Sequence, residues 1–237
     1  MKKQQKHFVI EALLKQGNVA TLSQLYHLTD VSSWQTKTPF ASIRRILQTN
    51  AEFFKIQPGL WGLTEYKKEI LEKFAIKDEK IINENEFTHA YYQGIIAEIG
   101  NKKRFKTFIP AQDKNRLFIN RKLSEIATTD KCDFTYPEII RFAKTIDVIW
   151  FNERNLPNSF FEVEHSTDFK NSINKFFELQ DFRARFFIVA KEERHKQFDN
   201  IINASIYSPI KDLITFKNYE SLVKQYEKEM TLIDIEI

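Results

Sequence analysis

Two glutamates stand two positions apart in a segment that is otherwise typical of a buried strand. Residues 159–167 read SFFEVEHST, so Glu162 and Glu164 lie within a run of aromatic and β-branched side chains. Side chains alternate between the faces of a strand, so both carboxylates are expected on one face, about 6–7 Å apart. Such neighbours repel each other unless one is protonated or a cation lies between them. Because Mg²⁺ prefers carboxylate oxygens, the spacing predicts a divalent metal site.

A third acid interrupts the preceding apolar run. Asp147 is flanked by Ile146 and Val148 in the segment KTIDVIWF, for which we predict a strand. The connection NERNLPN to the next predicted strand is turn-rich and short, which favours antiparallel pairing of the two strands. Pairing would bring Asp147 beside Glu162. Three carboxylates around one cation could activate water and stabilise the charge that develops on a phosphate.

The first 66 residues have a pattern of their own. Three amphipathic helices are predicted, in HFVIEALLKQ, TLSQLYHLTD and TPFASIRRILQTN, followed by a hairpin in FFKIQPGLWGL around Pro58-Gly59. This is the element order of a winged helix-turn-helix. The segment also holds eight Lys and Arg against four Asp and Glu, whereas the remaining residues are balanced. The excess of positive charge suits contact with a polyanion.

TPFASIRRILQ followed by FFKIQPGLWGL resembles the HARE-type winged-helix family. The resemblance implies a DNA-binding domain over residues 1–67 whose third helix, about Pro39–Thr49, enters the major groove. Two arginines would lie on or beside the contacting face and two lysines near phosphates, which gives the candidate DNA contacts Arg44, Arg45, Lys37 and Lys55. The alternative is that the arginines are solvated charges and the domain binds protein.

The second part begins after a charged stretch, residues 68–85, which we interpret as a short helix and a polar linker. From residue 86 to 237 we predict a helix over 87–100, strands in KRFKTFIP, KTIDVIWF and SFFEVEHST, an amphipathic helix in DFKNSINKFFELQDF, a strand in RFFIVAKE and two further helices. This order predicts an α/β (α+β) sandwich with a mixed central sheet.

The three acids and their order resemble the PD-(D/E)XK nuclease superfamily, the fold of most type II restriction endonucleases. Carried across, Asp147 takes the Asp position, Glu162 the first acid and Glu164 the place usually held by Lys. The resemblance implies that these three residues are catalytic and bind the metal, with Glu164 as a ligand or a proton acceptor. Alternatively, Lys170 or Lys175 on the following helix would supply the missing positive charge. The alternative is a degenerate nuclease fold that only binds.

Other polar residues flank this motif. His89 and Gln93 are four residues apart on a predicted helix and share a face, so Gln93 could hydrogen-bond a ligand carboxylate or a phosphate, or simply pack. His165 is expected to point away from the metal and to pack in the core. The run Lys102, Lys103 and Arg104 could bracket a phosphate backbone, or form a solvated turn.

Together these features predict a two-domain, Mg²⁺-dependent DNA endonuclease, for which Mn²⁺ would substitute. The expected partner is double-stranded DNA, the expected form a homodimer, and a restriction role, directed at modified DNA, follows from the resemblance alone. The alternative is a DNA-binding regulator without catalysis. A single Cys excludes an intramolecular disulfide, and no apolar run is long enough to span a membrane, so we expect a cytoplasmic protein. The sequence contains no phosphate-binding loop, so we expect no nucleotide cofactor.

Overall fold

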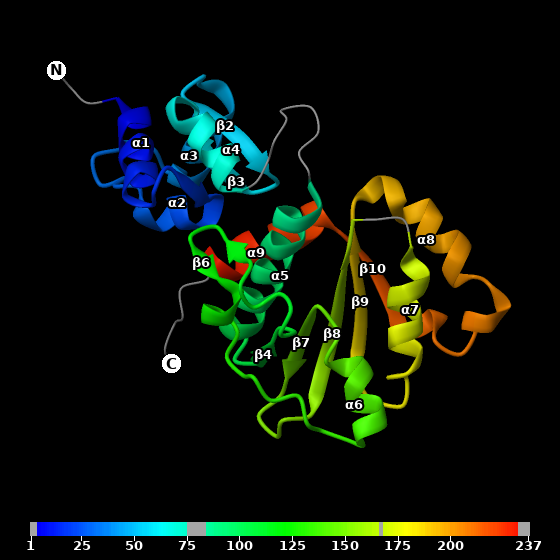
Figure 1. Ribbon diagram of the computed structural model, residues 1–237. Coiled ribbons are helices and arrows are strands. Elements are labelled where there is room, and N and C mark those ends of the chain that lie inside the picture. Colours follow the sequence, from blue (N-terminus) through cyan, green and yellow to red (C-terminus); the bar gives the residue numbers. More distant parts are fainter. Residues whose placement is uncertain (1–3, 75–83, 166–167, 232–237) are drawn as a thin grey trace. The chain divides into compact units, whose positions relative to one another are not determined.

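The computed structural model describes residues 4–74, 84–165 and 168–231 (Figure 1). The chain divides into two compact units, the first formed by Met1–Asn83 with Val223–Ile237 and the second by Glu84–Leu222. Each unit is described separately below. None of the described helices is both long and apolar enough to cross a membrane.

In the first unit, the described N-terminal residues form three helices, a three-stranded antiparallel sheet in the order β1-β3-β2, and a fourth helix, and α9 (Tyr219–Thr231) joins them from Val223 onward. Its N-terminal elements are α1 (Gln5–Lys15), β1 (Val19–Thr21), α2 (Leu22–Leu28), α3 (Pro39–Thr49), β2 (Phe53–Gln57), β3 (Leu60–Leu63) and α4 (Lys67–Lys73).

Local sequence signals explain where these elements begin and turn. The Thr21 hydroxyl accepts a hydrogen bond from the Gln24 backbone N–H, and the Gln24 side chain accepts one from the Thr21 N–H, which caps the start of α2. The hairpin predicted around Pro58-Gly59 is confirmed, and Gly59 adopts a φ of 76° between its two strands. The predicted third helix, α3, packs through Ile43 and Leu47 against the core of this unit.

The second unit is built around a five-stranded sheet in the order β10-β9-β8-β7-β4. The pairs β4–β7 and β7–β8 are antiparallel, whereas β8–β9 and β9–β10 are parallel, so the mixed sheet expected from the sequence is confirmed. Its elements are α5 (Glu84–Lys102), β4 (Lys106–Phe108), β5 (Leu117–Phe118), β6 (Arg121–Lys122), α6 (Pro137–Ala143), β7 (Val148–Phe151), β8 (Pro157–Glu164), α7 (Phe169–Phe177), β9 (Arg185–Ala190), α8 (His195–Ile202), β10 (Ile214–Asn218) and the start of α9 (Tyr219–Thr231).

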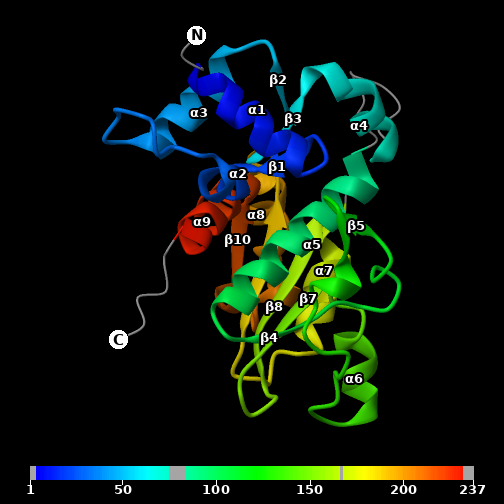
Figure 2. The same ribbon diagram turned by 90° about the vertical axis from the view of Figure 1, so that its left-hand side faces the viewer.

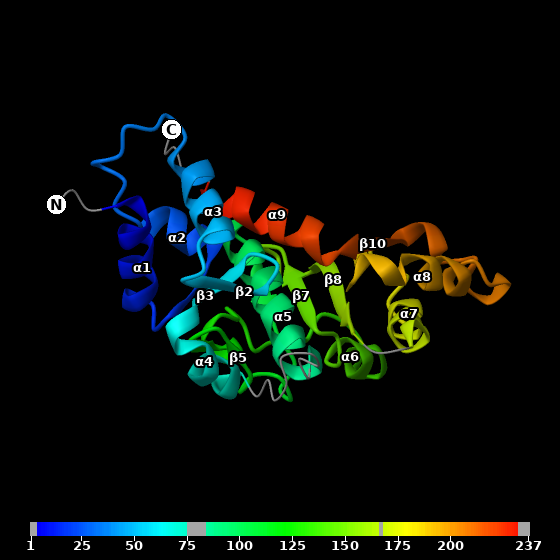
Figure 3. The same ribbon diagram turned by 90° about the horizontal axis from the view of Figure 1, so that it is seen from above.

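Helices cover both faces of this sheet. Figure 2 shows α5 lying across β4, β7 and β8, and the view from above places α7 and α8 on the opposite face (Figure 3). Successive side chains along each strand point to opposite faces of the sheet and pack against the helices there. Trp150 donates its indole N–H to the carbonyl of Ile96 in α5, while Phe160 and Phe186 stack on the other face, where Phe176 of α7 packs on Phe186. The sheet therefore holds the ends of β7 and β8 in a fixed position between α5 and α7.

Candidate active site

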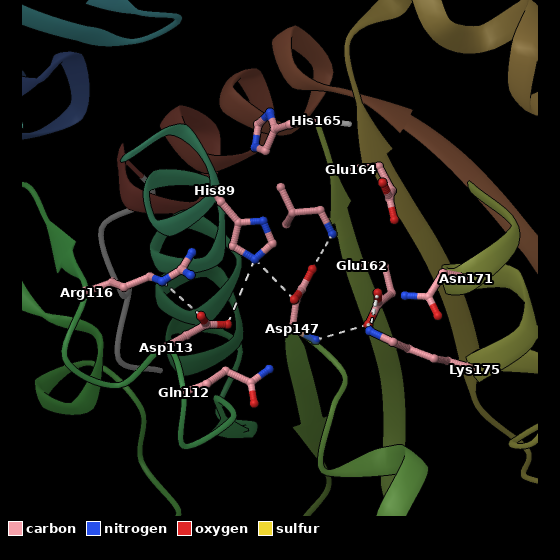
Figure 4. A pocket seen from close by; sticks show the side chains of 11 residues that line it. His89, Gln112, Asp113, Arg116, Asp147, Glu162, Glu164, His165, Asn171 and Lys175 are labelled. Atoms are coloured by element: carbon pink, nitrogen blue, oxygen red, sulfur yellow. Dashed lines mark hydrogen bonds and ion pairs between the residues drawn. The ribbon is translucent and has the colours of Figure 1, made fainter. Parts of the chain in front are cut away.

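A cavity of about 450 Å³ lies at the end of the sheet where β7 begins and β8 ends (Figure 4). Charged and polar side chains make up most of its wall. It is lined by His89, Gln112, Asp113, Arg116, Asp147, Glu162, Val163, Glu164, His165, Asn171 and Lys175.

Asp147 sits directly before β7, at the edge of the cavity. Val148 pairs with Phe161 in the antiparallel register of β7 and β8, so the next position back brings Asp147 opposite Glu162. The Asp147 backbone N–H donates to Glu162 Oε1 at 3.3 Å, and Asp147 Oδ2 accepts the Val163 N–H at 2.7 Å. The antiparallel pairing expected from the short connection, and the proximity of Asp147 and Glu162 that follows from it, are confirmed.

Glu162 and Glu164 lie on one face of β8, as their spacing predicts. Both carboxylates contact the hydroxyl of Ser172 in α7, which lies 3.0 Å from Glu162 Oε2. A serine hydroxyl carries one proton and can donate to only one acceptor at a time. The other contact becomes a hydrogen bond only if a glutamate carries a proton itself.

Lys175 of α7 supplies the positive charge on this side of the cavity. Its Nζ lies 2.8 Å from Glu162 Oε2, 3.1 Å from Glu162 Oε1 and 3.0 Å from the carbonyl oxygen of Thr145. Lys175 is three positions after Ser172 in the helix, so one face of α7 presents both side chains to the glutamates. Lys170, the other lysine considered from the sequence, is exposed at the start of α7 and does not line the cavity.

His89 of α5 lines the opposite wall, and Gln93, which does not line the cavity, contacts the same two aspartates from the same helix face, as expected. His89 Nε2 lies 3.1 Å from Asp147 Oδ1, and Gln93 Nε2 donates to the carbonyl oxygen of Asp147 at 3.3 Å. Both also approach Asp113, whose Oδ2 is 2.8 Å from Gln93 Nε2 and 3.9 Å from His89 Nε2. Figure 4 shows His89 between the two aspartates.

Asp113 is a site residue that the sequence did not indicate. It lies in the connection that follows β4, within the polar stretch AQDKNR, where an aspartate has no flanking strand or helix pattern to distinguish it. It is nevertheless buried, with 4% of its surface exposed, and its Oδ1 pairs with Arg116 Nε at 3.0 Å. Arg116 in turn lines the cavity.

The buried charges perturb one another. Burial raises the pKa of Glu162 to about 8, the charge of Asp147 adds to this, and Lys175 opposes it. Burial also raises the pKa of Glu164. Burial alone would raise the pKa of Asp147, but the charge and hydrogen bond of His89 outweigh it and the pKa is lowered. A proton on this side of the cavity is therefore held more readily by a glutamate than by Asp147.

His165 directly follows β8, and its ring faces α5, whereas the glutamates face α7. The Tyr219 hydroxyl is 2.7 Å from His165 Nδ1, and the ring also faces Tyr92 and His89. Burial, followed by the charge of His89, lowers the pKa of His165 to about 3. His165 packs against these rings, as expected from the sequence, although it is only partly buried and also lines the cavity.

None of the basic residues considered as DNA contacts is among those that line the cavity. On α3, Arg45 is exposed, and Arg44 forms an ion pair with Glu227 of α9 at 2.8 Å within the first unit. Lys37 and Lys55 are exposed in the same unit. Lys102, Lys103 and Arg104 lie at the C-terminal end of α5, about 20 Å along the helix axis from His89.

Comparison with known proteins identifies what this chain resembles. The family model of the type II restriction enzyme NmeDI C-terminal domain matches residues 71–235, which include every residue that lines the cavity. The type II restriction enzyme NmeDI of Neisseria meningitidis serogroup C is 27% identical over 122 residues, which cover 46% of this chain and 35% of that enzyme. The matched region is thus about a third of the length of that relative. No solved structure gives a significant match.

Proposed function

This chain belongs to the family of the type II restriction enzyme NmeDI C-terminal domain, and from this premise we propose that it is a metal-dependent endonuclease that hydrolyses phosphodiester bonds in DNA. The observation that carries the proposal is the convergence of Asp147, Glu162 and Glu164 on one polar cavity. A phosphodiester bond requires neutralisation of its negative charge and activation of a water molecule. Carboxylates at the end of a rigid sheet can hold the cation that does both.

We assign Asp147, Glu162 and Glu164 as ligands of Mg²⁺, with Mn²⁺ as a substitute. The fit rests on the two glutamates that share one serine hydroxyl, because Ser172 cannot satisfy both with a single proton. Their repulsion is relieved either by a proton or by a cation, and hard cations prefer oxygen ligands. When bound, such a cation supplies Lewis acidity toward water and phosphate.

Lys175 and Glu164 have further roles, the first in stabilising negative charge and the second in accepting a proton. Lys175 takes the part of the lysine that the PD-(D/E)XK pattern places at the position of Glu164, since its ammonium group reaches Glu162 from α7. There it stabilises negative charge on the phosphate. Glu164 is half-buried at the cavity and has a raised pKa, so it is suited to accept the proton of the attacking water.

The proposal extends to DNA binding and assembly. Residues 1–67 would form a winged helix-turn-helix domain of the HARE type, joined through residues 68–85 to a nuclease domain over 86–237. Its support is the order of three helices and an antiparallel hairpin, with the basic excess noted above. Cleavage of both strands of double-stranded DNA requires two active sites, which favours a cytoplasmic homodimer. Specificity for modified DNA would explain a dedicated binding domain.

The test is cleavage of plasmid and phage DNA, methylated and unmethylated, with Mg²⁺ or Mn²⁺. We expect the wild type to cut at least one substrate, and Asp147→Asn and Glu162→Gln to lose at least about 100-fold in rate. Lys170→Ala is the matched control on α7, because its side chain is exposed outside the cavity.

Two results would overturn the proposal. Equal cutting by the wild type and both acid variants would remove the assigned site. DNA binding without cleavage of any substrate would instead support a DNA-binding regulator with an inactive nuclease fold.

A further inference from the structure

We propose that His89, Asp113 and Asp147 form a second cation site, distinct from the Glu162 side of the cavity and selective for Mn²⁺, Co²⁺ or Zn²⁺ over Mg²⁺. The two positions share Asp147. A role of this second site in DNA cleavage rests on the proposed function, whereas its occupation by a metal ion does not.

The geometry of three side chains supports this site. One ligand atom from each of His89, Asp113 and Asp147 lies within 4.8 Å of the others. The closest pair, His89 Nε2 and Asp147 Oδ1, is 3.1 Å apart, and His89 Nε2 is 3.9 Å from Asp113 Oδ2. Ligands about 2.1 Å from one metal ion lie roughly 3–3.5 Å from each other. Small side-chain adjustments therefore suffice to place all three around one ion.

Neighbouring groups hold both carboxylates in place. Asp113 receives hydrogen bonds from Gln93 Nε2 at 2.8 Å and Arg116 Nε at 3.0 Å, and Asp147 Oδ2 receives the Val163 N–H at 2.7 Å. Such outer contacts fix the orientation of ligating carboxylates in metal sites. Asp147 Oδ1 is left facing His89.

A second observation points to a bound ion with its water. Gln93 is fully buried, and its Oε1 has no hydrogen-bond partner among the residues that the structure describes. The same amide group contacts Asp113 and the carbonyl of Asp147, so this acceptor lies beside the cluster. A water molecule on the ion would supply the missing donor.

The charge of the cavity wall favours a divalent ion. The lining includes four carboxylates and two permanent cations, Arg116 and Lys175. When all four carboxylates are ionised and His89 is neutral, as a metal ligand must be, two negative charges remain without compensation. A plain ion pair between protonated His89 and the aspartates is the competing explanation. The metal site and the ion pair differ in one observable feature, which is whether a nitrogen atom of His89 coordinates a metal ion.

Nitrogen coordination also sets the choice of ion. Mg²⁺ binds oxygen ligands and gives up its water reluctantly, whereas an imidazole nitrogen suits the later divalent ions of the first transition series. A His-Asp-Asp site should therefore bind Mn²⁺ more tightly than Mg²⁺. The ligands proposed on the Glu162 side are all carboxylates, and their oxygen atoms give no such preference.

Spin-echo EPR of Mn²⁺ bound to the full chain without DNA tests the assignment directly. We expect modulation from a directly bound histidine nitrogen in the wild type, abolished in His89→Gln and retained in His195→Gln, a matched variant of a histidine outside the cavity. Calorimetric titration should show Mn²⁺ affinity reduced at least about 10-fold in His89→Gln, with Mg²⁺ affinity changed little.

The wild-type spectrum tests nitrogen coordination even if His89→Gln fails to fold. Absence of nitrogen modulation in the wild type, or its persistence in His89→Gln, would overturn the proposal. Nitrogen coordination in a protein that cuts no DNA would uphold this site while the proposed function fails. DNA cleavage by a protein without nitrogen coordination would uphold the proposed function and overturn this site.

Discussion

Lys175 holds Glu162 at two points, with its Nζ 2.8 Å from Oε2 and 3.1 Å from Oε1. The lysine comes from a helix, not from the strand position two residues after Glu162, where Glu164 stands. The charge of a lysine is therefore present in the cavity although the β-strand lacks it. Because Glu162 is 3% exposed, this contact also affects the stability of the fold.

We predict that Lys175→Met destabilises the protein in a pH-dependent way. Burial raises the pKa of Glu162 to about 8, so above that value the buried carboxylate is ionised and requires its cation. Urea unfolding at about pH 9 should show a loss of about 3 kcal/mol in the free energy of unfolding. At about pH 5 the loss should shrink, because Glu162 is protonated there in the folded protein.

Two further variants test the origin of that loss. Glu162→Gln combined with Lys175→Met should restore stability at about pH 9 to within about 1 kcal/mol, because no buried charge is left unpaired. Lys170→Met, on the exposed start of the same helix, should change stability by less than about 0.5 kcal/mol. A loss in Lys175→Met that the double variant does not recover would mean that packing, rather than charge, is responsible.

A second prediction concerns the single thiol. Cys132 is 1% exposed, and burial raises the pKa of its thiol from 9.0 to about 12, with Lys144 opposing the shift and Asp133 adding to it. The thiolate is the reactive form. The native protein should therefore not react with a disulfide reagent at about pH 8, and one thiol should be titrated on unfolding. Rapid stoichiometric labelling of the native protein would contradict the burial.

The same shift makes a stability prediction with a definite sign. The folded pKa lies above the unfolded one, so the protonated thiol contributes stability that is complete below about pH 9. That contribution is lost as the pH rises from about 9 toward about 12. Cys132→Ala should remove this part of the alkaline slope in the free energy of unfolding. An identical slope in both proteins would show that other groups cause it.

Local patterns predicted the strand side of the site because its residues are close in sequence. Alternation placed Glu162 and Glu164 on one face, and the short connection placed Asp147 opposite Glu162. Helical spacing in DFKNSINKFFELQDF indicated α7, although the sequence could not choose between Lys170 and Lys175. That choice depends on the angle at which the helix packs on β8.

The other wall depends on tertiary structure. Asp113 reaches His89 only because α5 packs on β4 and the connection after β4 folds back over the helix. The strand β10 was not predicted, because the alternation in its residues ITFKN rests on only two apolar side chains, Ile214 and Phe216, and its pairing partner, β9, is separated from it by α8. The seven-residue α6 is likewise too short for periodicity to indicate it.

A third prediction uses a tight contact inside the second unit. A Cβ at Gly94 of α5 would lie 2.3 Å from two ring atoms of Phe118, which is itself 1% exposed. Alanine normally stabilises a helix interior relative to glycine by about 1 kcal/mol. Here overpacking should outweigh that gain, so Gly94→Ala should lower the free energy of unfolding by about 1–3 kcal/mol. Phe118→Leu in the Gly94→Ala background should recover part of it, and a net gain from Gly94→Ala alone would refute the clash.

The last prediction concerns Arg44, whose side chain is half exposed but pairs with Glu227 at 2.8 Å. Glu227 is 14% exposed and holds part of the guanidinium charge away from any phosphate. If α3 contacts DNA, Glu227→Gln should leave that charge free to bind a phosphate. The expected result is tighter binding at low salt and a salt dependence steeper by about one unit of slope, measured by fluorescence anisotropy over a salt series.

Point variants test this more sharply than removal of residues 1–66, because Val223–Ile237 belongs to the same unit and would lose its packing partner. Glu220→Gln provides a control, since this exposed glutamate lies at the start of the same helix, in the second unit. Arg45→Ala should weaken binding and flatten the salt slope by about one unit, because Arg45 is exposed on α3. Equal affinity and slope in the wild type, Glu227→Gln and Arg45→Ala would exclude α3 as the helix that binds DNA.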